Sequence, residues 1–468
     1  MKLLFSLRRG GTLLLCWWLV ALAHAAPAPT LTGDWQGALQ VMGTEIPLVF
    51  HLRQQPDNQY TGTMDSPKQQ AFGLPLAAVT VRVDSVVLRL SQPAAQFAGR
   101  LSADGKQLSG AWQQAGRSVP LTLTHQAAGT ASPAVRRPQD PQPPFPYRAE
   151  DVSFANAAAG IKLGGTVTVP AGKGPFPAVV LLTGSGAQDR DETIFGHRPF
   201  RLLADYLTRR GFVVLRYDDR GVGHSGGTAA TFTITDGVTD AQAAMAYLRS
   251  RSDVKGSQIG LLGHSEGAMI GLTAAASATS PAFLISLAGP AVRGLESILR
   301  QAEDLGRAAG IPAEQLAANK AVNQQVYMTV LSTPDNAQAQ THVVALLQQA
   351  GLSAAQAQQQ AALMVGPGYR QLLSFDPQPL LTKVKCPVLA LNGSKDLQVA
   401  ASVNIPAWEK GVRAGGNQDV TAQELPGLNH LFQTANTGLS QEYGQIEETF
   451  APSALAVIGD WLARHVKK

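Results

Sequence analysis

The sequence predicts two domains, a small all-β domain followed by a larger α/β domain built on a parallel sheet. Length, periodicity and proline content lead to this expectation. A chain of 468 residues is long for one domain. Residues 31–125 contain short strand-like segments without a long helical pattern, whereas strands and helices alternate after residue 148. A proline-dense stretch at residues 132–147 separates the two patterns.

The first 25 residues have the pattern of a secretory signal peptide. Basic residues at positions 2, 8 and 9 precede an apolar run at residues 13–22, and Ala23-His24-Ala25 forms an A-x-A cleavage site. The apolar run is too short to span a bilayer comfortably. We therefore expect an exported protein, periplasmic or secreted, that is not stably inserted in a membrane after cleavage.

Charge and cysteine content exclude several classes of partner. Cleavage would remove three cations and no acid, so the formal charge would fall from +5 to +2. Such a balance offers no basic surface for nucleic acid. Cys386 would be the one remaining cysteine, which excludes an intramolecular disulfide. No Cys/His cluster has metal-ligand spacing, and we expect neither a metal nor a cofactor.

Residues 26–127 are expected to form the β-rich domain, as a barrel or a sandwich. Asp104-Gly105 is typical of a hairpin turn. Residues 128–147 would follow as a proline-rich, extended linker. The strand-like segments of the β domain are residues 48–54, 78–91, 96–102 and 118–125.

Residues 148–468 are expected to form the α/β domain. Helical stretches at residues 198–210 and 239–250 lie between its first three strands, as in a parallel sheet with helices on both faces. From about residue 291 to 375 the alternation stops and the chain is rich in Ala and Gln, which predicts an inserted helical cap. The buried-type strands are residues 176–184, 211–218, 257–265, 282–289 and 386–393.

One strand-to-helix junction carries the sequence Gly263-His264-Ser265-Glu266-Gly267. G-x-S-x-G at such a junction is typical of a nucleophile elbow, a strained turn that exposes the serine hydroxyl. The alternative is chance, because the chain contains 46 glycines and G-x-S-x-G can occur in an ordinary turn. A base, an acid and an oxyanion hole are needed to support the catalytic interpretation.

His430 is the expected general base. It lies in a loop after a plausible last strand at residues 419–426, downstream of Ser265. His264 is set aside because an elbow residue next to the serine is expected to point away from the hydroxyl. The alternative for His430 is a loop histidine bound to backbone. The remaining histidines lie in the signal peptide, the β domain, the cap, the terminal helix or before the elbow: His24, His51, His125, His342, His465, His197 and His224.

Asp396 is the expected acid. It follows a strand that ends at Asn392, and the resulting order Ser…Asp…His is that of the α/β-hydrolase arrangement. A turn aspartate is the alternative role. Asp376 is a second candidate acid, although the proline after it favours a turn, and Asp419 is a third.

The oxyanion hole is expected to use the backbone N–H groups of Glu266 and Ser185. Glu266 follows the nucleophile, and Ser185 lies in a glycine-rich loop after an early strand. A phosphate cradle is the competing interpretation of that loop, but it lacks the G-x-x-x-x-G-K-[ST] pattern. The G-x-G-x-x-G match at residues 221–226 does not open a helix, so we interpret it as a structured loop near the site.

These segments resemble exported bacterial α/β-hydrolases of the carboxylesterase-like type, related to prolyl-oligopeptidase-like and serine aminopeptidase-like hydrolases. The resemblance covers nearly the whole mature chain. It implies an α/β-hydrolase fold with Ser265, Asp396 and His430 as nucleophile, acid and base. Thr183 departs from the family, because many of its members have a histidine there. The segments that carry the resemblance are GDWQG, TGSGAQDRDE, YDDRGVGHSGG, GHSEGA, FDPQPLLTKVKCPVLALNGSKDLQV and LPGLNHLFQ.

The resemblance implies acyl transfer to water through an acyl-enzyme, with a small-molecule ester or short peptide as substrate. A carboxylesterase for small or medium acyl groups is the first expectation, and a serine peptidase or thioesterase with the same triad is the second. An aminopeptidase would need a carboxylate for the substrate ammonium, and Glu266 is the candidate. A noncatalytic protein that captures a ligand with its β domain is the third. The sequence does not predict the oligomeric state.

Overall fold

The computed structural model describes residues 31–41, 44–55, 57–66, 71–90, 95–114, 117–126 and 135–466. The chain divides into two compact units, of which one holds Met1–Met64 with Leu74–Ala131 and the other holds Asp65–Gly73 with Ser132–Lys468. The expected signal peptide and residues 128–134 of the expected linker lie outside the described residues. Within the described ranges, no helix combines the length and apolar character needed to cross a membrane.

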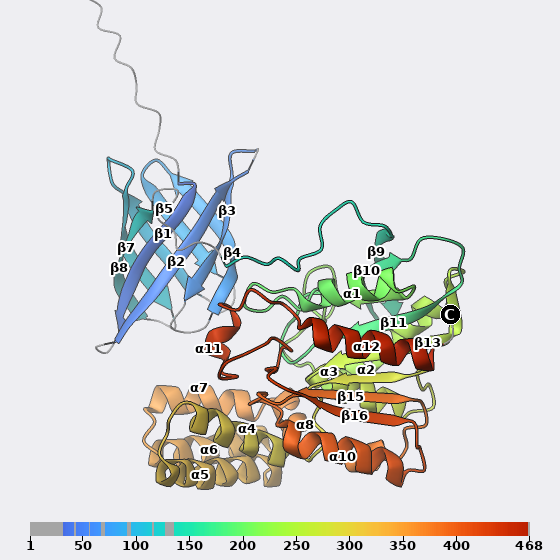
Figure 1. The fold of residues 1–468 in the computed structure, drawn as a ribbon. Helices are drawn as coiled ribbons and strands as arrows, with labels where there is room; N and C mark the ends of the chain where they lie inside the picture. The colour runs from blue at the N-terminus through green and yellow to red at the C-terminus, as the bar shows by residue number, and fades with distance from the viewer. Residues whose placement is uncertain are drawn as a thin grey trace, which may run out of the picture. The chain divides into compact units, whose positions relative to one another are not determined.

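The N-terminal strands form a closed eight-stranded barrel, which resolves the sequence-based choice between barrel and sandwich (Figure 1). Closure comes from antiparallel pairing of the first strand with the last, Asp34 opposite Gln126. Asp104 and Gly105 form the predicted turn, in which Gly105 has a φ of 69°. The strands are β1 (Gly33–Val41), β2 (Thr44–Gln54), β3 (Tyr60–Ser66), β4 (Ala71–Arg82), β5 (Ser85–Leu90), β6 (Ala95–Leu101), β7 (Gln107–Gln114) and β8 (Arg117–Gln126).

Side chains fill the interior of this barrel. In β5, Val86, Leu88 and Leu90 are buried, and they alternate with residues that are more exposed, as the pleat of a strand requires. The large rings of Trp35 and Phe50 are fully buried in the same core.

The second unit contains an eight-stranded sheet in the order β16-β15-β14-β13-β11-β12-β10-β9. The six strands from β11 to β16 pair in parallel, as expected. The positions of β11, β12, β14 and β15 are buried almost throughout, which explains the continuous apolar runs in the sequence, whereas β16 and the first half of β13 are more exposed. The strands are β9 (Arg148–Asn156), β10 (Ile161–Val169), β11 (Phe176–Leu182), β12 (Val213–Tyr217), β13 (Val254–His264), β14 (Leu284–Leu287), β15 (Val388–Gly393) and β16 (Val420–Leu425).

The sheet has an antiparallel edge that the sequence analysis did not predict. β9 and β10 pair antiparallel with each other, and β10 pairs antiparallel with β12. A short turn joins β9 to β10 and contains Gly160 at a φ of 67°, so the two strands form a hairpin rather than a crossover unit.

Helices cover both faces of the sheet. α1 (Pro199–Arg209) and α12 (Pro452–His465) pack on one face, and α2 (Ile234–Arg249), α3 (Glu266–Ala275) and α10 (Ala401–Ala414) pack on the other. Successive side chains of a strand point to opposite faces of the sheet. Alternate residues of β11 therefore pack into the hydrophobic cores on the two faces. The layered α/β-hydrolase fold predicted from the sequence is therefore confirmed.

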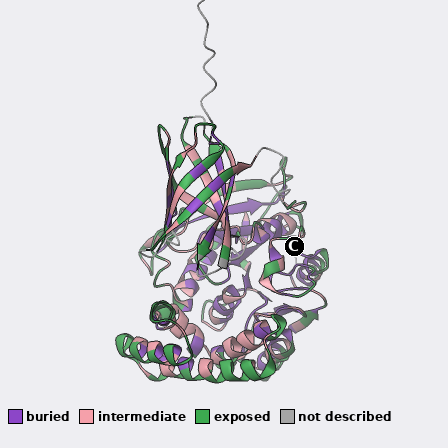
Figure 2. Ribbon diagram, turned by 90° about the vertical axis from the view of Figure 1, so that its left-hand side faces the viewer, coloured by how far each residue is buried: buried purple, intermediate pink, exposed green. Residues whose placement is uncertain are grey.

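Five helices between β14 and β15 form a separate layer with its own core, which includes Val326, Val330 and Val343. Their outward sides are largely exposed, whereas the strands of the central sheet are mostly buried (Figure 2). These helices occupy the segment in which the sequence predicts a cap. They are α4 (Gly294–Ala308), α5 (Ala313–Ser332), α6 (Asn336–Gln349), α7 (Ala354–Met364) and α8 (Pro367–Ser374); the short helices α9 (Gln378–Leu381) and α11 (Ser440–Tyr443) lie outside this layer.

Candidate active site

Ser265 occupies the turn between β13 and α3, in a strained backbone conformation with φ 52° and ψ −114°. A residue with a β-carbon rarely adopts a positive φ, and such strain is typical of functional sites. The flanking glycines permit the turn. A β-carbon on Gly263 would lie 2.1 Å from the carbonyl oxygen of Gly267, and one on Gly267 would lie 2.1 Å from that of Leu182. The local geometry is that of a nucleophile elbow.

Replacement of Gly267 by alanine should destabilise the protein. The added methyl group meets backbone rather than a flexible side chain, so the free energy of unfolding should fall by about 2 kcal/mol. Urea unfolding measures the change. The matched control is Gly226→Ala, whose added β-carbon would have no neighbour closer than 3.5 Å. Equal effects in the two variants would contradict the close-approach argument.

The structure brings His430 and Asp396 together. The Nδ1 atom of His430 lies 2.8 Å from Oδ2 of Asp396, and both side chains are buried. The other carboxylate oxygen of Asp396 accepts the backbone N–H groups of Gln398 and Val399, both at 2.8 Å, which fixes the carboxylate. With Nδ1 bonded to the carboxylate, Nε2 is the nitrogen left to act as a base.

The other candidate acids lie elsewhere. Asp376 pairs with Arg293 at 3.2 Å and accepts the N–H of Gln378, so it acts as a turn former. Asp419 pairs with His465 at 3.0 Å. Neither aspartate bonds to His430, and the geometry therefore favours Asp396 as its partner.

The glycine-rich loop after β11 supplies backbone donors. The N–H of Gly184 donates to Oε1 of Glu192 at 2.6 Å and is therefore engaged. The N–H of Ser185 has no such partner among the described residues, and Ser185 is exposed in the same pocket as Ser265. Of these two amides, that of Ser185 is the one available to an oxyanion. The other expected donor, Glu266, begins α3, where the positive end of the helix dipole lies.

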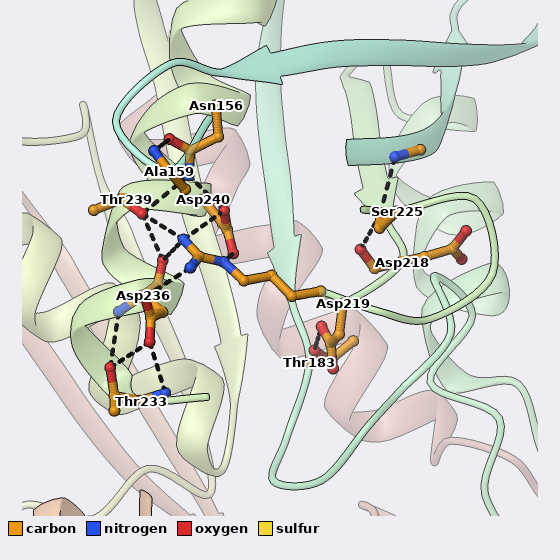
Figure 3. A network of polar contacts seen from close by, with 12 residues as sticks. Asn156, Ala159, Thr183, Asp218, Asp219, Ser225, Thr233, Asp236, Thr239 and Asp240 are labelled. Atoms are coloured by element: carbon orange, nitrogen blue, oxygen red, sulfur yellow. Dashed lines mark hydrogen bonds and ion pairs between the residues drawn. The ribbon is translucent and has the colours of Figure 1, made fainter. Parts of the chain in front are cut away.

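The side chain of Asp219 also holds the glycine-rich loop after β11 in place. One of its carboxylate oxygens accepts the hydroxyl of Thr183 at 2.7 Å (Figure 3). The other accepts the N–H of Gln188 at 2.9 Å, so one side chain connects both ends of the loop. Its neighbour Arg220 binds Asp236 and Asp240 of α2, which anchors this segment to the helix. Thr183, which departs from the family pattern, thus has a structural partner.

Burial raises the pKa of Asp219 to about 7, against an ordinary value of 3.8, and the nearby charges of Glu192 and Glu266 add to the effect. Between these two pH values the folded protein keeps a proton that the unfolded chain loses. The contribution of Asp219 to stability is therefore fully present below pH 3.8 and is lost as the pH rises to about 7.

Asp219→Asn should remove this pH dependence. Relative to wild type, the variant should gain on the order of 2 kcal/mol between pH 5 and pH 8, because an amide does not titrate. Thermal unfolding of both proteins at the two pH values measures the gain. A difference in Tm between variant and wild type that is the same at pH 5 and pH 8 would contradict a raised pKa.

Ser265, His430 and Ser185 line one pocket of about 300 Å³. Such a volume lies at the small end of ligand sites. Leu305 of α4 lines it too, so the cap helices help to shape the pocket. The other apolar or aromatic side chains that line it are Ile194, Phe195, Leu431 and Tyr443.

Glu266 lines a different, much smaller cavity, together with Asp219 and Asp240. Burial raises the pKa of its carboxyl group. The one acidic residue that lines the pocket of Ser265 is Glu192, which is 3% exposed and already bonded to two donors. The side chain of Glu266 is therefore poorly placed to hold a substrate ammonium in that pocket.

Two further segments can now be placed. His264 lines the same pocket as Ser265, its ring nitrogens bond to Glu192 and to the carbonyl of His430, and its ring centroid lies 4.9 Å from that of His430. Residues 221–226 form a structured loop but do not line the pocket of Ser265. This loop bonds instead to β10, for example from the N–H of Gly226 to the carbonyl of Lys162.

The sequence analysis did not identify Glu192 as a residue of the site, because it lies in a charged run without a recognisable motif.

A comparison with models of known protein families identifies the family of this chain. A model described as serine aminopeptidase, S33, matches residues 198–434, which include Ser265, Asp396 and His430. Among the described residues, no group of three or more His, Cys, Asp or Glu side chains could hold a metal ion.

Two curated relatives are similar in sequence. Esterase EstD of Thermotoga maritima is 28% identical over 272 residues, which cover 58% of this chain and 58% of EstD. The uncharacterized protein YfhR of Escherichia coli K12 is 34% identical over 124 residues, which cover 26% of this chain and 40% of YfhR. The chain thus matches little more than half of the first relative and less than half of the second.

Two solved structures are similar at low identity. An esterase of Pyrococcus furiosus has a TM-score of 0.43 at 15% identity, with coverage of 72% of this chain and 99% of that one. A proline iminopeptidase-related protein of Thermus thermophilus has a TM-score of 0.41 at 21% identity, with coverage of 68% and 99%.

Proposed function

This chain belongs to the serine aminopeptidase S33 family of α/β-hydrolases, and from that premise we propose that it is a serine esterase for small or medium acyl groups. The observation that carries the proposal is the convergence of a strained elbow serine, a carboxylate-bound histidine and a backbone donor on one pocket of about 300 Å³. Family membership makes the chain a hydrolase, and the similarity to EstD supports an ester substrate.

In the proposed reaction, Oγ of Ser265 attacks the acyl carbon while Nε2 of His430 takes the hydroxyl proton. The Ser185 and Glu266 amides would stabilise the oxyanion of the tetrahedral intermediate. His430 then returns the proton to the leaving alcohol, and the acyl group stays on the serine. A water molecule, activated by His430 in the same way, releases the carboxylic acid and restores the serine.

The pocket lining favours an ester over an N-terminal peptide substrate. A peptide ammonium needs an available carboxylate, and the one acidic side chain lining the pocket, Glu192, is already bonded to Gly184 and His264. The apolar lining suits an acyl chain. Peptidase activity is the second candidate, and the description of the family model is what favours it.

Paired chromogenic assays on residues 26–468 test the proposal. We expect turnover of p-nitrophenyl acyl esters, with a preference for short to medium chains because the pocket is small, and no cleavage of aminoacyl p-nitroanilides. The Ser265→Ala protein is the background control for both substrates. Anilide cleavage comparable to ester cleavage would replace the esterase proposal with a peptidase.

We expect the purified enzyme to be active without added metal or cofactor. Dialysis against a chelator measures this directly, since the rate on a p-nitrophenyl ester should be the same before and after treatment. Loss of activity that returns on addition of a divalent cation would contradict a purely side-chain mechanism.

A further inference from the structure

One carboxylate oxygen connects the segments that carry the catalytic groups. Oε1 of Glu192 accepts the N–H of Gly184 at 2.6 Å and lies 2.9 Å from Nδ1 of His264. Nε2 of His264 lies 3.0 Å from the carbonyl oxygen of His430. The chain of contacts therefore runs from the oxyanion loop, through the residue before the nucleophile, to the backbone of the expected base.

The partners of His264 indicate its protonation state. Both ring nitrogens face oxygen acceptors, a carboxylate at Nδ1 and a backbone carbonyl at Nε2. An imidazole can donate to both only as the imidazolium, because the neutral ring carries one N–H. The short bond from Gly184 to the same carboxylate oxygen is typical of an ionised acceptor.

Electrostatics supports this assignment. Burial by itself lowers the pKa of His264. The charge and hydrogen bond of Glu192 and the carbonyl of His430 raise this pKa by more than burial lowers it, so the net pKa lies above its ordinary value. The titratable groups that act on His264 are Glu192 and, through its charge, Asp396; the ring of His430 faces it with a centroid distance of 4.9 Å. The two partners are buried, with side chains 9% and 4% exposed for His264 and Glu192.

We propose that Glu192 and His264 form a buried ion pair that positions the oxyanion loop and the catalytic base, a role that rests on the proposed function of Ser265. Because Glu192 holds the Gly184 amide, it fixes the loop that carries Ser185, whose amide is the expected oxyanion donor. Because His264 donates to the carbonyl of His430, it fixes the backbone that carries the base. Neither side chain reacts; both act through the groups that they hold.

The backbone of Glu192 has the strained conformation that is typical of functional residues. Glu192 adopts a φ of 51°, a left-handed conformation that costs free energy in a residue with a long side chain. Its own N–H donates to the carbonyl of Asp189 at 2.9 Å, and its neighbour Asp191 pairs with Arg216 at 2.8 Å. The turn thus presents the Glu192 carboxylate to His264 and Gly184 while its neighbours anchor it to the sheet.

Glu192→Gln tests the positioning role with nearly the same side-chain volume. A neutral amide gives His264 no negative charge to pair with, so the ring should become neutral. The one side-chain atom that now accepts from both Gly184 and His264 can then satisfy only one of them. We expect kcat on a p-nitrophenyl ester to fall 10- to 100-fold with KM changed less than threefold, since the lost geometry matters most in the transition state. The matched control is Glu409→Gln, on the exposed side of α10, which should keep the wild-type kcat.

The protonation state of His264 can be measured independently of catalytic activity. In protein labelled with ¹⁵N-histidine, both ring nitrogens of His264 should carry protons at a pH where an ordinary histidine, with a pKa of 6.5, is half neutral, and Glu192→Gln should convert the ring to the neutral form. The His264→Asn variant assigns the signal. A neutral His264 in wild type, or an unchanged kcat in Glu192→Gln, would overturn the proposal. Full activity in Ser265→Ala would instead overturn the proposed function, while the spectrum still decides whether the ion pair exists.

Discussion

Ser265→Ala is expected to lower kcat on a p-nitrophenyl ester by about 10⁵- to 10⁶-fold, the scale found when a serine nucleophile is removed from a triad. The physical reason is that alanine offers no atom to form the acyl-enzyme, so only water remains as nucleophile. The oxyanion donors and the pocket stay in place, and a residual rate above that of the uncatalysed reaction should therefore persist.

The variant should fold normally, because the serine side chain is not needed for the elbow. The backbone N–H of Ser265 donates to the carbonyl of Leu287 at 2.8 Å, and alanine keeps that bond. Thermal unfolding provides the control, with a Tm close to that of wild type. A folded Ser265→Ala protein with wild-type turnover would contradict a role for this serine in covalent catalysis.

Asp396→Asn is expected to lower kcat by about 10⁴-fold at neutral pH, the effect of the equivalent change in a well-studied triad. An asparagine can turn its amide nitrogen toward Nδ1 of His430, which would place the ring proton on Nε2, the nitrogen that must accept the proton of Ser265. The variant also loses the negative charge that stabilises the imidazolium formed during the reaction.

The matched control for this variant is Asp376→Asn. That aspartate also accepts a backbone N–H, but it pairs with Arg293 rather than with a histidine. We expect Asp376→Asn to keep kcat within about twofold of wild type. Equal activity of the two variants, measured across pH 6–9, would show that the acid of the site is not Asp396.

Periodicity was sufficient to predict the fold where burial is uniform. Strands β11, β14 and β15 and the second half of β13 are buried, so they appear in the sequence as apolar runs. The antiparallel edge was not predicted because β9 mixes exposed charges such as Arg148 and Asp151 with partly buried residues. An edge strand solvated on one side has no continuous apolar signal.

Chain order and local motifs were sufficient to nominate Ser265, Asp396 and His430, and the structure pairs the last two directly. Their catalytic roles stay predictions. Glu192 and the true placement of His264 could not be predicted, because their contact joins residues 72 positions apart and depends on a left-handed turn. Nothing in the local sequence distinguishes Glu192 from its charged neighbours.

The measurement that tests the central claim most directly is covalent labelling with a fluorophosphonate, followed by mass mapping of the modified peptide. The reagent phosphonylates an activated serine and mimics the first step of acyl transfer. We predict one modification per chain, on Ser265, with loss of esterase activity in proportion to labelling. Modification of a different serine, or full activity after complete labelling of Ser265, would contradict the assignment of Ser265 as the nucleophile.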